Sequence, residues 1–153
     1  MKVWRISLAK FAHSAFSGEG ARRFDARWNF AGAPMVYTSS SLALAAMEFF
    51  VHLDPSQIAV PLVSVMAQVP ENVSVERIEV AKLPRDWRRS DHGELQQLGT
   101  DWLKALRSVA LIVPSAAIPG EWNVLLNPLH AEFKKIKIGE PAPFRYDARM
   151  FKL

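Results

Sequence analysis

Glu48 is the residue whose surroundings in the sequence most strongly suggest chemistry. It lies in the stretch "SSSLALAAMEFFVHLDP", where no other residue between Ser41 and Leu53 carries a formal charge. The apolar residues of this stretch recur at helical spacing and cover most of the helix surface, which predicts a buried helix. A buried carboxylate without a partner is costly. We therefore expect Glu48 either to serve in a pocket, where it could bind a sugar hydroxyl or stabilise developing positive charge, or to be partly exposed and paired with an arginine.

Arg27 is the second candidate, and it lies in the stretch "DARWNFAGAPMVYTSSS". A guanidinium can hold a pyrophosphate through two parallel hydrogen bonds. The alternative for Arg27 is a surface ion pair, and Arg22 and Arg23 could share either role. Asn29 and Gly32 are residue types that shape turns, so we expect them to form the turn between Arg27 and the strand that follows.

Tyr37 and Ser115 complete the set of polar candidates. The Tyr37 ring could stack on a flat heterocycle, or it could be a half-buried strand aromatic with a satisfied hydroxyl. Ser115 ends the apolar run "LIVPS" and is not surrounded by the Gly-x-Ser-x-Gly pattern of a nucleophile elbow. We therefore expect Ser115 to act through hydrogen bonds, the alternative being a serine that only caps a turn at the strand end.

Several common catalytic arrangements are absent from the sequence. There is no cysteine, which excludes disulfides, thiolate metal sites and a cysteine nucleophile. The histidines at 13, 52, 92 and 130 are dispersed, and "EFFVH" lacks the second histidine of a zinc-binding helix, so no metal is expected. There is no Walker loop and no Gly-x-Gly-x-x-Gly, and the glycine-rich "SGEGARR" does not directly follow a strand.

Length and composition favour one globular domain over residues 1–153. The N-terminal stretch has no signal-peptide pattern, and no apolar run approaches the ~18 residues of a membrane span, so a soluble cytoplasmic protein is expected. The net charge is +4, from 19 Lys+Arg against 15 Asp+Glu. Because the basic residues are scattered or interleaved with acids, direct DNA or RNA binding is the least favoured explanation of this charge.

The elements that must position the candidates follow from hydrophobic periodicity. Strands are expected at residues 2–8, 34–39, 57–69, 73–80, 109–115 and 121–128, with two closing strands around a Gly/Pro turn in residues 133–151. The clearest helix lies within residues 39–55, with Ser39 or Ser40 as N-cap and Pro55 after its end, and a second helix, weakened by Gly99, spans residues 92–108. Residues 10–33 are expected to form a long loop. Strands outnumber helices without alternating with them, which indicates an α+β fold with a mixed or largely antiparallel sheet.

Three stretches in order along the chain resemble the RES domain family, which is named for an arginine, a glutamate and a serine. They are "WRI" near the start, "RWNFAGAPMVYTSSSLALAAMEFF", and "LIVPSAAIPGEWNVLLNPLHAEF". The name-giving residues then correspond to Arg27, Glu48 and Ser115, and Tyr37 and Asn127 match further pocket positions. The chain departs from many family members at Ala26, where they have glycine before the arginine.

The resemblance implies a split sheet with flanking helices, similar to ADP-ribosyltransferase toxins, with NAD+ as substrate. It implies a bacterial toxin that depletes NAD+ by breaking the nicotinamide–ribose bond, by hydrolysis or phosphorolysis, with Arg27, Glu48 and Ser115 as catalytic residues. The residues that bind NAD+ would be Arg27, Tyr37, Ser115 and Asn127. The implied partner is an antitoxin with a helix-turn-helix (Xre-like) domain, part of which covers the active site.

Two other functions stay open at the level of the sequence. Some relatives transfer ADP-ribose to a protein, which is the second enzymatic reading. A non-catalytic module that binds an antitoxin or nucleic acid is the third, although a pure binding surface has little use for a carboxylate in an apolar helix. An assay for nicotinamide release separates the enzymes from the module.

Overall fold

The computed structural model describes residues 1–54, 56 and 58–151, and an eight-stranded sheet forms its centre. The strands are β1 (Lys2–Leu8), β2 (Val36–Ser39), β3 (Leu62–Gln68), β4 (Val75–Arg77), β5 (Ala110–Pro114), β6 (Trp122–Leu126), β7 (Lys137–Ile138) and β8 (Ala142–Phe144). Their order is β4-β5-β6-β2-β1-β3-β7, and β8 also pairs with β3. Among these pairs only β4 with β5 is parallel, so the expected α+β class with a mixed sheet is confirmed.

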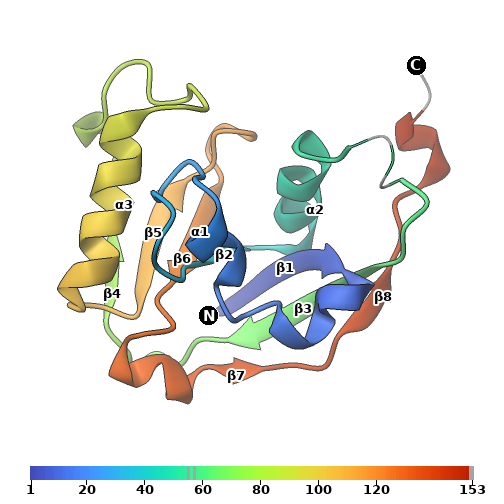
Figure 1. Ribbon diagram of the computed structural model, residues 1–153, viewed down its shortest axis with the longest axis horizontal. Helices are drawn as coiled ribbons and strands as arrows, with labels where there is room; N and C mark the ends of the chain where they lie inside the picture. The colour runs from blue at the N-terminus through green and yellow to red at the C-terminus, as the bar shows by residue number, and fades with distance from the viewer. Residues whose placement is uncertain (55, 57, 152–153) are drawn as a thin grey trace.

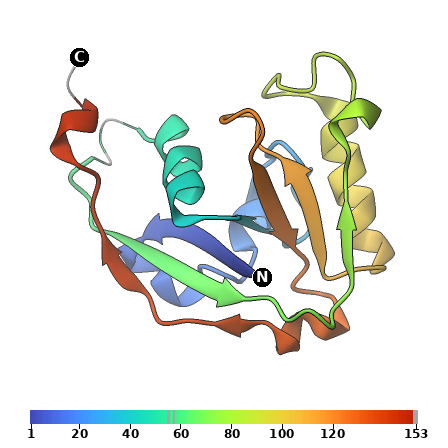
Figure 2. The ribbon, with the colours of Figure 1, turned by 180° about the vertical axis from the view of Figure 1, so that it is seen from behind.

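The sheet is nearly divided between β1 and β2. β1 pairs with β3 along its whole length, from Lys2 opposite Gln68 to Leu8 opposite Leu62. By contrast, β1 and β2 pair through Trp4 and Ser39. The result is two half-sheets, β4-β5-β6-β2 and β1-β3-β7-β8, whose strands run in clearly different directions in Figures 1 and 2. This junction is the split that the family resemblance implies.

Two helices cover the two halves. α2 (Leu42–Val51) follows β2 directly and packs on β1, where Ala45 joins a small cluster with Ile6, Leu62 and Tyr146. α3 (Gly93–Ala105) lies beside the other half (Figure 1) and shares a tryptophan-rich cluster with β5 and β6. The buried members of that cluster are Ala21, Trp28, Met35, Trp87, Leu95, Trp102, Leu103, Leu111, Val113 and Leu125. Tryptophans 87 and 102 are thus core residues. No helix in the described part of the chain is long and apolar enough to span a bilayer.

The segment from 10 to 33 is more structured than the sequence indicates. It contains the end of the 3-10 helix η1 (Ala9–Ser14) and the short helix α1 (Glu19–Arg23). Helix propensity does not predict α1, because the stretch contains glycines at 18 and 20 and glycine disfavours helix interiors. Gly18 has φ +75°, and a Cβ there would lie 2.6 Å from the backbone nitrogen of Met35, so this glycine lets α1 pack tightly on the chain before β2.

Some details of the elements also differ from the expectation. The N-cap of α2 is Ser41, whose Oγ accepts a hydrogen bond of 3.1 Å from Leu44 N, and not Ser39 or Ser40. The strand expected from residue 57 begins at Leu62, and the expected positions Pro55 and Gln57 lie outside the described residues. The two expected closing strands are β7 and β8, and both pair with β3.

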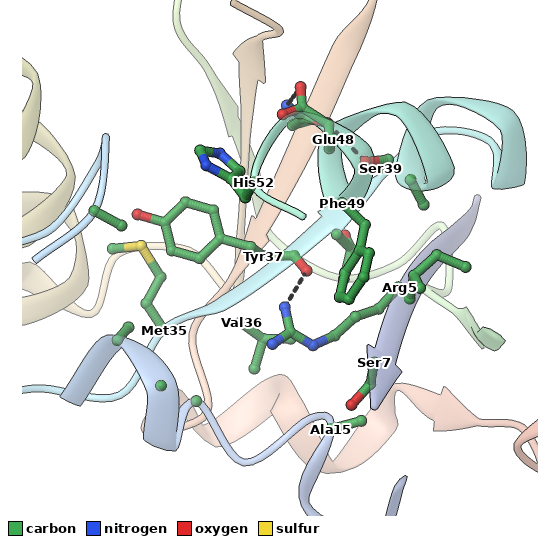
Figure 3. Close-up of a pocket in the computed structure, with 18 of the residues that line it drawn as sticks. Arg5, Ser7, Ala15, Met35, Val36, Tyr37, Ser39, Glu48, Phe49 and His52 are labelled. Atoms are coloured by element: carbon green, nitrogen blue, oxygen red, sulfur yellow. Dashed lines mark hydrogen bonds between the residues drawn. The ribbon is translucent and has the colours of Figure 1, made fainter. Parts of the chain in front are cut away.

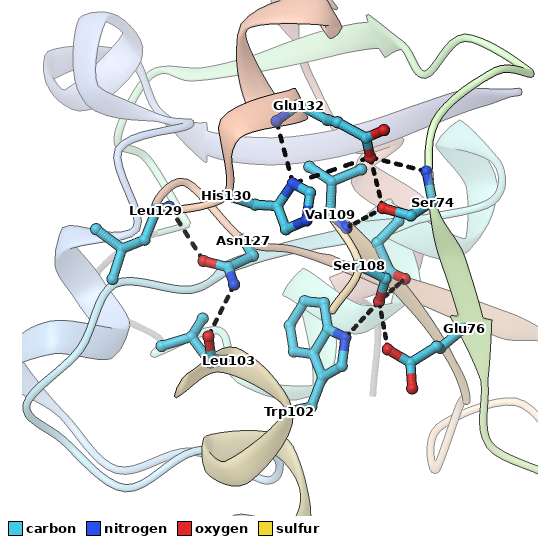
Figure 4. Close-up of polar contacts among 11 residues, drawn as sticks. Ser74, Glu76, Trp102, Leu103, Ser108, Val109, Asn127, Leu129, His130 and Glu132 are labelled. Carbon is cyan, nitrogen blue, oxygen red and sulfur yellow. Dashed lines mark hydrogen bonds and ion pairs between the residues drawn. The ribbon is translucent and has the colours of Figure 1, made fainter. Parts of the chain in front are cut away.

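A network of hydrogen bonds fastens the β4 edge to α3 and β5 (Figure 4). Trp102 Nε1 donates to Ser108 Oγ at 2.7 Å, and Ser108 Oγ donates to Glu76 Oε2 at 2.7 Å. The Ser108 hydrogen bond, followed by Arg107, holds the pKa of the Glu76 carboxyl below its usual range. The remaining short helices are η3 (Val80–Lys82), η4 (Ala131–Lys135) and η5 (Ala148–Phe151), and η4 is tied to this edge because Ser74 N donates to Glu132 Oε2 at 2.8 Å.

Ser108→Ala is expected to destabilise the fold by about 1–3 kcal/mol, because it leaves the buried Trp102 N–H without an acceptor. A carboxyl whose pKa is lowered on folding stabilises the folded state above its unfolded pKa, and this contribution disappears as the pH falls through the folded pKa. The wild type should therefore lose more stability than Ser108→Ala when the pH is lowered from 7 to 4. Thermal unfolding by circular dichroism at both pH values measures this. Equal losses in the two proteins would contradict the linkage between Ser108 and Glu76.

Candidate active site

A cavity of about 670 Å³ opens where the two half-sheets separate (Figure 3). Its walls come from β1, from η1 and α1, from the loop that carries Arg27, from β2 and from α2. Its size lies within the range of about 300–1,000 Å³ that is typical of small-molecule sites. Among the sequence candidates, Arg27, Tyr37 and Glu48 line this cavity. Segments far apart in the sequence thus place three expected residues at one site.

Glu48 is held by two neutral hydrogen-bond donors and not by an arginine. Its Oε1 accepts from Ser115 Oγ at 2.6 Å and from Asn123 Nδ2 at 2.7 Å. Asn123 is itself oriented by Ser39 Oγ, which donates to Asn123 Oδ1 at 2.8 Å. No described residue forms a hydrogen bond with Glu48 Oε2. Because neutral donors fix the carboxylate without cancelling its charge, Glu48 presents an oriented negative charge to the cavity.

Ser115 is 1% exposed and lies behind Glu48 as seen from the cavity, which it does not line. Its Oγ donates to Glu48 and also accepts from Ala117 N at 3.2 Å and Ile118 N at 3.0 Å. Both uses that the sequence left open, hydrogen bonding and capping the turn after β5, are therefore combined in one hydroxyl. In this arrangement Ser115 positions the carboxylate from outside the cavity lining.

Arg27 is half-buried and has no carboxylate partner among the described residues, so it is not a surface ion pair. Its Nη1 donates to two backbone carbonyls, Trp87 O at 3.1 Å and Arg89 O at 2.8 Å. Burial lowers the pKa of the guanidinium, and the charge of Glu48 across the cavity partly restores it. No hydrogen bond joins Nε or Nη2 to a described residue. Arg27 is thus fixed by one nitrogen and retains donors for an anion. The nearby Arg22 and Arg23 instead pair with Glu19.

Tyr37 lines the cavity, and its hydroxyl is already engaged in two hydrogen bonds. The hydroxyl donates to Asn29 Oδ1 at 2.6 Å and accepts from Trp28 N at 3.1 Å. Burial raises the pKa of the phenol, so it stays neutral at physiological pH. Asn29 also donates to Ala21 O and Phe24 O, which confirms that it shapes the turn. The flat face of Tyr37 is therefore the part available for stacking.

Arg5 is a cavity residue that the sequence argument did not single out. Its Nη1 donates to Tyr37 O at 2.9 Å and so crosses the split from β1 to β2 (Figure 3). Its Nε is buried without a partner among the described residues, and burial lowers the pKa of the guanidinium. A buried cation without a carboxylate is costly unless an anion fills the space beside it. The available signal was an arginine inside the apolar strand "KVWRISL".

Asn127 does not belong to the cavity. It is fully buried, its Nδ2 donates to Leu103 O at 2.9 Å, and its Oδ1 accepts from Leu129 N at 3.0 Å (Figure 4). Both ends of the amide are thus used to fasten α3 to the chain after β6. The asparagine beside Glu48 is Asn123, at the other end of the same strand, and an asparagine within the apolar run "WNVLL" was the signal for it. We therefore give Asn127 no role in the site.

Among the described residues, no group of three or more His, Asp or Glu side chains is placed to hold a metal ion. The cavity instead brings together the oriented carboxylate of Glu48, the guanidinium groups of Arg5 and Arg27, which have no carboxylate partner among the described residues, and the ring of Tyr37. This set can bind a ligand that carries both negative groups and a flat ring, and it can stabilise positive charge that develops near Glu48.

An α+β domain with this split sheet is also found in a chain of the crystal structure of the M. tuberculosis MbcT–MbcA toxin–antitoxin complex. The TM-score is 0.75 at 18% identity, over 94% of this chain and 84% of that one. The model of the RES domain matches residues 2–147, so the chain belongs to the RES domain family.

Two relatives are similar along nearly their whole length. A protein named Toxin Res from Photorhabdus laumondii is 32% identical over 154 residues, which cover 99% of this chain and 98% of the relative. A protein named Prs ADP-ribosylating toxin from Sphingobium sp. is 35% identical over 154 residues, covering 97% of this chain and 96% of the relative.

Proposed function

We propose that this chain is the toxin of a toxin–antitoxin pair and that it cleaves the nicotinamide–ribose bond of NAD+. The observation that carries the proposal is Glu48, which two neutral donors hold as an oriented carboxylate at a cavity of dinucleotide size. Membership in the RES domain family, and the names of its relatives as toxins, support the biological role.

The chemistry fits a site with a single catalytic carboxylate. Breaking the bond to nicotinamide gives the ribose oxocarbenium character, and the cationic ring departs as neutral nicotinamide. Little acid catalysis is needed, so a second carboxyl, as in ordinary glycosidases, is not required. Glu48 stabilises the ribose cation electrostatically, and Ser115 and Asn123 hold the carboxylate in place.

The rest of NAD+ requires cations and a stacking surface, and the cavity supplies both. Arg27 and Arg5 have free guanidinium donors and no carboxylate partner among the described residues, which suits the pyrophosphate. The Tyr37 ring suits the nicotinamide, since its hydroxyl is occupied elsewhere. No metal is part of this proposal.

Transfer of ADP-ribose to a protein is the second candidate activity, because the relative from Sphingobium sp. is named as an ADP-ribosylating toxin. The two activities share bond cleavage and differ only in the group that attacks the ribose. In either case we propose that an Xre-like antitoxin with a helix-turn-helix domain covers the cavity. The family resemblance and the presence of an antitoxin in the MbcT–MbcA complex support this partner.

The deciding experiment incubates the purified chain with NAD+, with and without inorganic phosphate, and identifies the products by mass. Release of nicotinamide is the expected result. Free ADP-ribose would indicate hydrolysis, a phosphorylated ADP-ribose would indicate phosphorolysis, and label on an added protein would indicate transfer. If NAD+ stays intact under all of these conditions while the chain still binds its antitoxin, the non-catalytic module is the better description.

A further inference from the structure

His52 lies at the C-cap of α2, one turn beyond Glu48, and lines the same cavity. Residues four apart on a helix lie on one face, and Figure 3 shows the imidazole on the cavity side of α2, toward Tyr37. It is the only histidine among the described residues that line the cavity. The side chain is exposed, and no described residue forms a hydrogen bond with its ring. Nothing in the packing of α2 therefore explains a histidine at this position.

The proposed reaction leaves one task without a residue. In hydrolysis, and in transfer to a protein hydroxyl, the group that attacks the ribose must give up a proton. Glu48 is needed as an anion beside the ribose cation, and its Oε1 already accepts two hydrogen bonds. The guanidinium groups of Arg5 and Arg27 do not accept protons. Tyr37 is neutral, with its hydroxyl proton donated to Asn29.

Two further carboxylates line the cavity, and both come from the opposite wall. Glu19 on α1 is paired with Arg22 and Arg23. Asp25, just after α1, accepts a hydrogen bond of 2.7 Å from Ala31 N. Both are thus occupied by partners on their own segment, whereas His52 stands beside Glu48 with its ring nitrogens open to the cavity and to solvent. Histidine is also the side chain best suited to take up and release a proton near neutral pH.

We propose that His52 is the general base that accepts the proton of the attacking water or hydroxyl group. The bond from ribose C1′ to the nicotinamide nitrogen breaks, and its electron pair stays on nicotinamide. The attacking oxygen bonds to C1′, and its proton passes to a ring nitrogen of His52, which returns it to solvent. This role rests on the proposed cleavage of NAD+. It assigns the residue that deprotonates the attacking group.

The test is His52→Gln, which keeps a polar side chain of similar reach but cannot take up the proton. General bases contribute roughly 10²–10⁴-fold, so NAD+ hydrolysis should fall by about 10²-fold or more. The KM for NAD+ and the melting temperature should stay unchanged, since the exposed ring has no described partner to lose.

Azide separates this role from a structural one, because an azide anion attacks C1′ without giving up a proton. Added azide should restore nicotinamide release in His52→Gln and form the glycosyl azide. The matched control is His13→Gln, which changes an exposed histidine on η1 that does not line the cavity and should behave as wild type. Undiminished hydrolysis by His52→Gln, or a loss that azide does not repair, overturns the role of His52. A wild-type chain that releases no nicotinamide overturns the proposed function as well, so the two failures are distinguishable.

Discussion

The variant Glu48→Gln is expected to release nicotinamide roughly 10²–10³-fold more slowly than the wild type, the scale typical of removing one preorganised electrostatic group. Glutamine has nearly the same shape, and its amide oxygen can still accept from Ser115 Oγ and Asn123 Nδ2. The hydrogen-bonded arrangement therefore survives while the negative charge beside the ribose is lost. Steady-state nicotinamide release, with circular dichroism to verify folding, measures the effect.

Glu71→Gln is the matched control for the loss of one negative charge. Glu71 is exposed on the turn between β3 and β4 and is not among the residues that line the cavity. Its replacement should leave the rate and the melting temperature near those of the wild type. Robust turnover by a folded Glu48→Gln protein would remove Glu48 from the mechanism, whatever the control shows.

The variant Gly99→Ala is expected to cause the largest loss of stability, about 3 kcal/mol, which is the upper end of typical overpacking costs. A Cβ at Gly99 would overlap the carbonyl oxygen of Trp28 and lie 2.8 Å from its carbonyl carbon. These are backbone atoms in a tightly held segment, since Phe30 N donates to Thr100 Oγ1 at 2.9 Å and Trp28 N donates to the Tyr37 hydroxyl. The clash therefore has no flexible side chain to move aside.

The same change should reduce NAD+ cleavage, because Arg27 immediately precedes Trp28. A cost of about 3 kcal/mol corresponds to a melting temperature lowered by roughly 6–12 °C in a domain of this size. Gly93→Ala, in the first turn of the same helix, is the control, because a Cβ there meets nothing within 4 Å. If Gly99→Ala has the same melting temperature as Gly93→Ala, the close approach of α3 to Trp28 does not exclude a side chain at position 99.

The sequence predicted the fold class and allowed most residues of the candidate site to be proposed, because both depend on local patterns. An isolated charge in an apolar helix indicated Glu48, and ordered motifs added Arg27, Tyr37 and Ser115. What lay beyond prediction depends on contacts between strands distant in sequence. Arg5 and Asn123 acquire their positions only when β1 and β6 lie on either side of β2. Asn127 matched a motif but points into α3, because the end of β6 carries it away from the cavity.

Gly99 illustrates a similar limit. In the sequence it weakens a predicted helix, whereas in the structure it is the point where α3 can touch the backbone beside Arg27. Helix propensity includes only the cost of glycine to the helix. It contains no information about the close packing that the absence of a side chain permits. The same holds for α1. Gly18 argues against a helix in the sequence, whereas in the structure its left-handed backbone conformation begins α1 as the N-cap.

The junction of β1 and β2 also makes the stability of the folded chain depend on what is bound in the cavity. Trp4 with Ser39, and Arg5 with the Tyr37 carbonyl, hold the two half-sheets together at this point. A ligand that binds Arg5 on one half and the residues around Glu48 on the other acts as an added clamp, and a ligand at a hundred times its Kd stabilises a folded protein by about 2.7 kcal/mol. If the chain cleaves NAD+ as proposed, a falling NAD+ concentration would withdraw this added stability from the chain itself. A bound antitoxin that occupies the same junction would replace it.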